Sequence, residues 1–271
     1  MSTAPQSPLA TPVPWDLVSA GYESDIVPVF ESYARDALRL AGVEAGRHVL
    51  DVAAGPGTLA LLAAEESARV DAIDFAPAMI ERLERRVRER GAENVVARVG
   101  DGQALPYADE SFDSAFSMFG LMFFPDRAKG FAELRRVLRP GGTALVSSWH
   151  PIDAVPAMRV LFTTLRELMP APAPDGPPPL SSAASVREEM EAAGFRDVEV
   201  HTIVHAMRHD SLHAMFESME RSMAPLLLLR TRLGAEAWAP IARKLRDALA
   251  VELGEGPAVT EMPAYFGLGR R

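Results

Sequence analysis

Short apolar segments alternate with helical patterns through the first half of the chain, and this alternation restricts the fold more than any other feature. The segments with strand character are His48–Val52, Arg69–Asp74, Asn94–Val99, Phe112–Met118 and Thr143–Trp149. Helical patterns fill the intervals at 58–66, 77–90 and 126–138, and Pro140-Gly141-Gly142 should stop the last of them. Strands that alternate with helices form a mostly parallel sheet with helices on both faces. The sequence therefore predicts an α/β, Rossmann-like fold.

The second half adds two strands and a long helical stretch. Residues 197–205 and 257–269 are predicted strands, which gives a seven-stranded sheet, and 211–250 is a helical stretch between them. Further helices are predicted at 23–41, 156–169 and 185–193, and 170–180 is a proline-rich loop. We expect an N-terminal leader and cap helices (1–46), a Rossmann-like core (47–205), a helical lid or substrate insertion (206–256) and the final strand (257–271).

Composition excludes several classes of function. The 271 residues suit one large α/β domain or a domain with an added cap, and a net charge of −9 argues against a nucleic-acid partner. The absence of cysteine removes disulfides and thiolate sites and favours a cytoplasmic location. The apolar run at 224–229 is too short to insert into a membrane, and the proline-rich start is a frayed leader rather than a signal peptide. A homodimer is left open.

The stretch VLDVAAGPGTLAL (49–61) places an acid and two glycines at the start of a helix. Gly55 and Gly57 allow the backbone to approach a ligand, which would lie beyond the carboxyl ends of the strands. Asp74 ends the second strand about 20 residues later, where an acid can accept both hydroxyls of a ribose. Asp101, in GDGQALPYADESFD, ends the third strand, where it could bind the N6 of adenine. An adenosine-containing cofactor is therefore expected.

Asp51 distinguishes S-adenosylmethionine from NAD. An acid before the glycines repels a pyrophosphate but suits a ligand with an amino group and a sulfonium. Ala60 also stands where the dinucleotide fingerprint has its third glycine, and no Tyr-x-x-x-Lys pair is present. Both observations favour S-adenosylmethionine.

The combined motifs resemble the class I S-adenosylmethionine-dependent methyltransferases, within them the branch of the ubiquinone and menaquinone biosynthesis methyltransferases. The matching pieces are VLDVAAGPGT, VDAIDFAPAMIERLERR, GDGQALPYADESFD and ELRRVLRPGG, in this order across about residues 47–149. The resemblance implies a cofactor site made of Tyr22, Asp51, Ala53, Gly55, Gly57, Asp74, Phe75, Asp101, Gly102, Gln103 and Met118.

Each part of that site has an implied role. Asp51 and the glycines would line the methionine part of the cofactor, and Tyr22 would cover it. Asp74 would hold the ribose beside Phe75, while Asp101, with the backbone of Gly102 and Gln103, would hold the adenine. Ala53 stands where the family usually has glycine. The simpler alternatives are a tight turn at the glycines, a helix cap at Asp74, a turn acid at Asp101 and packing at Tyr22.

The acceptor side offers one candidate catalytic residue and no metal site. His150 follows the fifth strand and could contact the substrate or act as a base, or simply cap the loop. His201, His205, His209 and His213 are four apart, but the first two belong to a predicted strand, so no metal site is expected. The apolar run 118–124 stands where metal-dependent relatives place a carboxylate, and part of it should face the substrate.

The sequence thus predicts methyl transfer from S-adenosylmethionine to a small, rather apolar molecule. O-methylation of a secondary metabolite is favoured, and C-methylation of a quinone-like ring comes next. The alternative is an S-adenosylmethionine-binding regulatory or structural protein without transferase activity.

Overall fold

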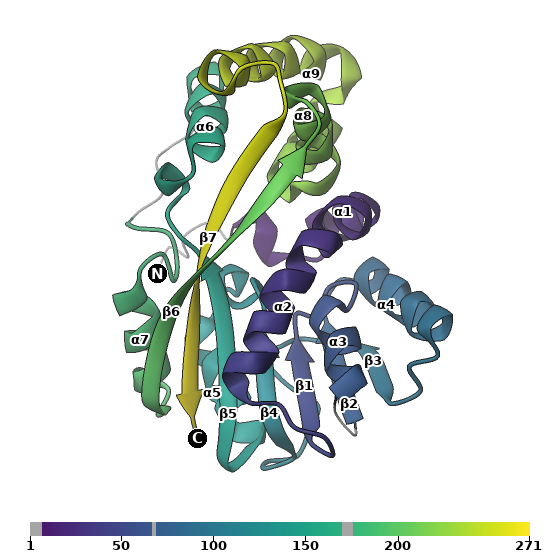
Figure 1. Cartoon of the computed structure of the whole chain (residues 1–271), viewed down its shortest axis with the longest axis vertical. Helices are drawn as coiled ribbons and strands as arrows, with labels where there is room; N and C mark the ends of the chain where they lie inside the picture. The colour runs from purple at the N-terminus through teal and green to yellow at the C-terminus, as the bar shows by residue number, and fades with distance from the viewer. Residues whose placement is uncertain (1–6, 67–68, 170–175) are drawn as a thin grey trace, which may run out of the picture.

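A seven-stranded sheet forms the centre of the computed structural model, which describes residues 7–66, 69–169 and 176–271 (Figure 1). The strands are β1 (His48–Val52), β2 (Arg69–Asp74), β3 (Val95–Val99), β4 (Phe112–Ser117), β5 (Leu138–Trp149), β6 (Arg196–His209) and β7 (Ala258–Arg270). Their order is β3-β2-β1-β4-β5-β7-β6. Pairs from β3 to β5 are parallel, and β7 is antiparallel to β5 and β6. The predicted mostly parallel, Rossmann-like sheet is confirmed.

Helices cover both faces of the sheet, as predicted, because alternate strand residues point to opposite faces. Val49 packs with α2 (Val27–Ala41), α3 (Thr58–Glu66) and part of α4 (Pro77–Arg90). Leu50 and Val52 pack on the other face with α5 (Arg127–Val137) and α7 (Ala183–Ala192). The two apolar layers hold the strand ends in fixed positions.

Helix α5 ends differently from the prediction. Asp126 caps its start by accepting a hydrogen bond from the Lys129 backbone N–H. The helix ends at Val137, and the Pro140-Gly141-Gly142 turn lies inside β5. Gly141 has a φ of 79°, a value that favours glycine, so this turn bends a strand instead of stopping a helix.

The N-terminal region begins its helices earlier than expected. A 3₁₀ turn, η1 (Pro8–Ala10), is followed by α1 (Val13–Gly21), a single π-helical turn η2 (Tyr22–Ile26) and then α2. The predicted leader is therefore wrong from Pro8 onward, because proline is tolerated in a first helical turn; its first six residues lie outside the described ranges.

Strands β6 and β7 continue beyond the sheet as a two-stranded ribbon. Their pairing runs to His209 and Ala258, whereas β5 pairs with β7 only as far as Trp149 and Ala264. Between the two ribbon strands the chain forms α8 (Leu212–Ser222) and α9 (Ala224–Leu253), which is kinked at Gly234 (Figure 1). Helix α6 (Pro156–Leu168), which comes after β5, packs on α9. We call these three helices the helical cluster.

The helical cluster has its own apolar core. Leu161 of α6, Met215 and Met219 of α8, and Leu245 of α9 are buried together. Helix α6 was expected within the core range 47–205, but it packs with α9 instead. The cluster also contacts α1, which connects it to the N-terminal region. Part of the predicted loop, residues 170–175, lies outside the described ranges.

Candidate functional site

A cavity of about 340 Å³ lies at the carboxyl ends of β1 to β4. It is lined by Ala10, Pro12, Trp15, Tyr22, Ala53, Gly55, Asp74, Phe75, Met79, Gly100, Asp101, Gly102, Gln103, Met118, Phe119, Gly120, Phe123, Phe124 and Pro125. A smaller hollow of about 40 Å³ is walled by several of the same residues together with Asp51 and Phe30. The larger volume lies within the range of small-molecule sites, and this edge is where open α/β sheets bind ligands.

Asp51 is the least satisfied polar group of the site. Its side chain is 1% exposed, Oδ2 accepts a hydrogen bond from the Ala60 N–H at 3.1 Å, and Oδ1 has no partner. Desolvation, with a smaller contribution from the charge of Asp74, raises the pKa of Asp51 to about 7. A buried carboxylate with an unpaired oxygen is costly, so the arrangement suits a ligand that brings a donor or a positive charge.

Asp74 joins the glycine loop to the start of α4. Its Oδ2 accepts from the Gly55 N–H at 2.8 Å and its Oδ1 accepts from the Ala76 N–H at 2.9 Å. Burial raises the pKa of Asp74 to about 6, although these hydrogen bonds lower it. The Ala76 N–H precedes the first residue of α4, so Asp74 holds the turn before the helix and does not cap it, and the same side chain lines the cavity.

The two glycines of the loop are needed for different reasons. Gly55 has a φ of 54° and open space where a Cβ would lie, so it leaves room for a ligand. Gly57 has a φ of 80°, and a Cβ there would meet the Leu83 side chain at 2.1 Å. Ala53 adopts a φ of 58°, which glycine tolerates better.

The acid after β3 makes a turn at the other end of the cavity. Asp101 accepts hydrogen bonds from the Gln103 backbone N–H at 2.8 Å and from its side-chain amide at 3.1 Å. Gly102 is required because a Cβ would lie 2.6 Å from the Phe124 ring. The predicted residues Phe75, Asp101, Gly102 and Gln103 all line the cavity.

Two aromatic residues of the N-terminal region cover the cavity. Tyr22 lines both hollows, and burial together with the charge of Asp74 raises the pKa of its hydroxyl well above its usual value. Trp15 lies seven residues earlier, donates from Nε1 to the Leu9 carbonyl at 2.9 Å and has its ring 5.0 Å from that of Phe123. Trp15 was missed from sequence because it stands in the segment interpreted as a leader.

The run after β4 supplies apolar wall and core. Met118, Phe119, Phe123 and Phe124 line the larger cavity, whereas Leu121 is fully buried in the core. Phe30 of α2, which was not predicted for the site, packs on Phe119 with ring centres 4.9 Å apart.

His150 is not brought to the cavity. It follows β5, stacks on Tyr265 of β7 with ring centres 3.8 Å apart and lies 3.4 Å from the Thr202 hydroxyl. Partial burial lowers its pKa. This position gives its predicted catalytic role no support.

The histidine series does not form a cluster. His201, His205 and His209 lie on β6, and His213 lies on α8. Across residues 7–66, 69–169 and 176–271, no three histidine, aspartate or glutamate side chains are grouped as metal ligands would be. The helices in the same ranges are all too short or too polar to cross a membrane.

Comparison with known proteins identifies the family of the part of the chain that supplies most of the cavity wall. Residues 49–142 match the family model of a methyltransferase domain. The chain belongs to the class I S-adenosylmethionine-dependent methyltransferases, enzymes whose cofactor is S-adenosylmethionine, and it resembles the menaquinone branch.

The similar proteins differ in how much of the chain they match. An uncharacterised protein of Mycobacterium tuberculosis is 32% identical over 223 residues, which are 80% of this chain and 79% of that protein. A demethylmenaquinone methyltransferase of Thermus thermophilus is 40% identical over 121 residues, 44% of this chain and 54% of that enzyme. The YcgJ protein of Bacillus subtilis shares the fold, with a TM-score of 0.62 and 20% identity over 89% of this chain and 98% of its own.

Proposed function

We propose that the cavity holds S-adenosylmethionine along the carboxyl ends of β1, β2 and β3. The unpaired Oδ1 of Asp51 carries this proposal, because the amino group of the cofactor would supply the donor that the buried carboxylate lacks. The ribose hydroxyls would bind Asp74, and the open space before Gly55 would accept the cofactor without a clash. The adenine would lie between Phe75 and the Asp101–Gln103 turn.

The acceptor would approach the methionine end of the cofactor. When bound, S-adenosylmethionine supplies an electrophilic methyl group. Tyr22, Phe30, Met118 and Phe119 would exclude water there and align the acceptor. Alignment of two bound reactants is a large part of such catalysis. No base is assigned, because His150 lies outside the cavity wall.

The apolar wall supports a small, rather apolar acceptor. O-methylation of a secondary metabolite is the first candidate. C-methylation of a quinone-like ring is the second candidate. The similarity of 121 residues to the Thermus demethylmenaquinone methyltransferase supports it. A cytoplasmic location and the absence of a nucleic-acid partner stay predictions from charge and composition.

Methyl-labelled S-adenosylmethionine can distinguish these candidates. The protein is incubated with a panel of phenols and of demethylated quinols, and the products are examined by NMR. Label on a phenolic oxygen supports the first candidate, and label on a ring carbon supports the second. Tight binding of S-adenosylhomocysteine with no labelled product from any acceptor would instead favour a binding protein without transferase activity.

A further inference from the structure

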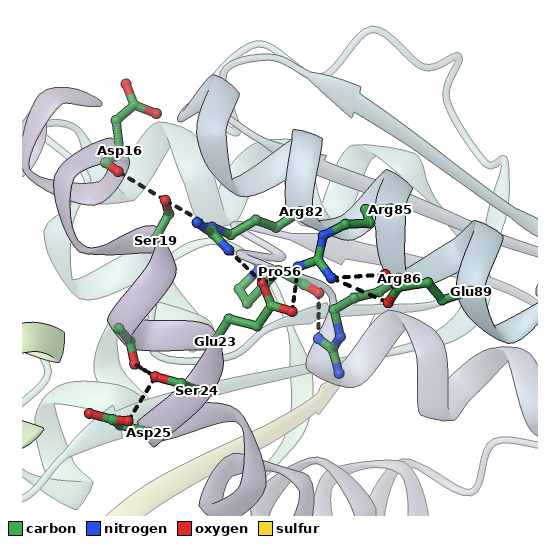
Figure 2. Close-up of polar contacts among 11 residues, drawn as sticks. Asp16, Ser19, Glu23, Ser24, Asp25, Pro56, Arg82, Arg85, Arg86 and Glu89 are labelled. Atoms are coloured by element: carbon green, nitrogen blue, oxygen red, sulfur yellow. Dashed lines mark hydrogen bonds and ion pairs between the residues drawn. The ribbon is translucent and has the colours of Figure 1, made fainter.

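Polar contacts fasten the N-terminal covering segment, α1 with η2, to helix α4 (Figure 2). Asp16 Oδ1 accepts a hydrogen bond from the Ala78 N–H at 2.9 Å, at the start of α4. Ser19 Oγ accepts from Arg82 Nε at 3.0 Å. Glu23 binds Arg82, with 2.8 Å between Oε2 and Nη1, and it also binds Arg85. The three residues of the segment lie on one helical face, since they are three and four positions apart.

The two ends of this row stand next to the rings that cover the cavity. Asp16 follows Trp15, and Glu23 follows Tyr22. Asp16 also supplies a hydrogen-bond acceptor at the start of α4. The residue at the N-cap position of that helix, Ala76, makes no side-chain cap hydrogen bond. The row therefore fixes α1 and η2 against α4 at the two points from which the rings project.

The contact of Glu23 coincides with the irregular turn. The Val27 N–H donates to the Tyr22 carbonyl, an i→i+5 bond that makes η2 a π-helical turn. Single π turns cost regular helical hydrogen bonding and occur frequently at functional sites. The ion pairs of Glu23 are suited to hold this turn, because they anchor the residue that follows Tyr22.

The ion pair of Glu23 with Arg82 is partly shielded from solvent, whereas its second partner, Arg85, is more exposed. The Glu23 side chain is 19% exposed and that of Arg82 is 29% exposed, so solvent screens them incompletely. Partial burial raises the pKa of Glu23, but the hydrogen bonds from Arg82 and Arg85 outweigh it and hold that pKa below its usual range. Glu23 is consequently ionised at neutral pH and can act as a fixed anchor.

We propose that Glu23 and Asp16 are positioning residues for cofactor binding, Glu23 for the ring of Tyr22 and Asp16 for the ring of Trp15. The proposal rests on the cofactor placement given above. Glu23 serves the amino-acid end, because Tyr22 shares the smaller hollow with Asp51. Asp16 serves the nucleoside end, because Trp15 contacts Phe123 on the wall that also holds Asp101 and Gln103.

Two ligands can distinguish effects at the amino-acid end of the cofactor site from effects at the nucleoside end. S-adenosylhomocysteine carries both ends, and 5′-methylthioadenosine lacks the amino-acid end. Calorimetry on Glu23→Gln should show binding of S-adenosylhomocysteine weakened by about tenfold, the order expected for one hydrogen bond to a charged group. Binding of 5′-methylthioadenosine should stay within about twofold of wild type, within the scatter of such comparisons. Asp16→Asn should weaken both ligands.

Glu31→Gln is the matched control. Glu31 of α2 also pairs with α4, through Arg90 at 3.4 Å, but its side chain lies outside the cavity wall. This variant should bind both ligands like wild type. Glu23→Gln should also have little further effect in a Tyr22→Ala background, because two residues that act through one contact are not additive.

The outcomes are distinguishable from failure of the proposed function. If the wild type binds neither ligand, the cofactor placement itself is wrong. If the wild type binds both but Glu23→Gln weakens them equally, or binds them unchanged, or adds its full effect to Tyr22→Ala, the positioning role of Glu23 is overturned. Equal binding of both ligands by Asp16→Asn and wild type overturns that of Asp16.

Discussion

Asp51 and Asp74 are two buried acids whose ionised forms the ligand-free protein disfavours. Burial raises the pKa of Asp51 to about 7 and that of Asp74 to about 6, both above the values of an unfolded chain. The folded protein therefore binds more protons than the unfolded chain across roughly pH 4 to 7. Their stabilising contribution is present at low pH and is lost as pH rises through that window.

Asp51→Asn should stabilise the ligand-free protein and weaken cofactor binding. At pH 8 the ligand-free variant should be more stable than wild type, by on the order of 1–3 kcal/mol, since one pKa unit corresponds to about 1.4 kcal/mol. At pH 5 the difference should shrink, and affinity for S-adenosylhomocysteine should fall at both pH values. Urea unfolding at the two pH values measures this. A variant less stable than wild type at pH 8 would show that Asp51 is not a buried, uncompensated charge.

Residues of the candidate site could be predicted from the sequence where the order of the strands alone determines their position. Asp51 and Asp74 lie at the carboxyl ends of β1 and β2, and Asp101 comes two residues after β3, so the three acids had to meet at one edge of the parallel sheet. Trp15 of the cavity and Phe30 of the smaller hollow were missed because they come from helices whose position depends on tertiary packing. His150 also follows a strand, but stacking on Tyr265 directs it away from the cavity.

At the scale of elements, the N-terminal helices rather than the inserted helices cover the cavity. The sequence predicted that the insertion at 206–256 would form a helical lid or bind the substrate. Tyr22 and Phe30 line the two hollows, whereas no residue of α8 or α9 is among their lining residues. Periodicity identified the inserted helices but missed α1, and it carries no information on which element a helix contacts.

Met219 tests the role of the helical cluster. Its side chain is 7% exposed within the apolar core of that cluster. Met219→Ala should lower the free energy of unfolding by about 2–5 kcal/mol, as expected for a large core side chain, and leave the choice of acceptor unchanged. Thermal unfolding and the acceptor panel are the measurements. A changed acceptor profile at unchanged stability would restore the substrate role expected for the insertion.

Hydrogen exchange tests the covering segment independently. Amides of α1 and η2 should gain protection when S-adenosylhomocysteine binds, because the ligand would contact Trp15 and Tyr22. Amides of α8 and α9 should change little. Protection confined to α8 and α9 would instead assign the covering role to the helical cluster.

For the whole molecule, we expect methyl transfer without a divalent metal. The wall after β4 is apolar where a metal ligand would be needed, with Met118 and Phe119 lining the cavity. Activity with the best acceptor should therefore survive dialysis against EDTA. Loss of activity that magnesium or zinc restores would show that the acceptor side has been misinterpreted.

Asp51 and Asp74 should together bind S-adenosylmethionine at the carboxyl edge of the sheet. Calorimetry with S-adenosylhomocysteine tests it most directly, with wild type and Asp74→Ala measured beside each other and NAD as the competing ligand. The wild type should bind S-adenosylhomocysteine but not NAD, and Asp74→Ala should lose about 1.5–3 kcal/mol of binding free energy, the range for hydrogen bonds to a charged group. Binding of NAD in preference to S-adenosylhomocysteine would show that the site holds a different cofactor, and equal binding by wild type and Asp74→Ala would show that Asp74 does not bind the ribose.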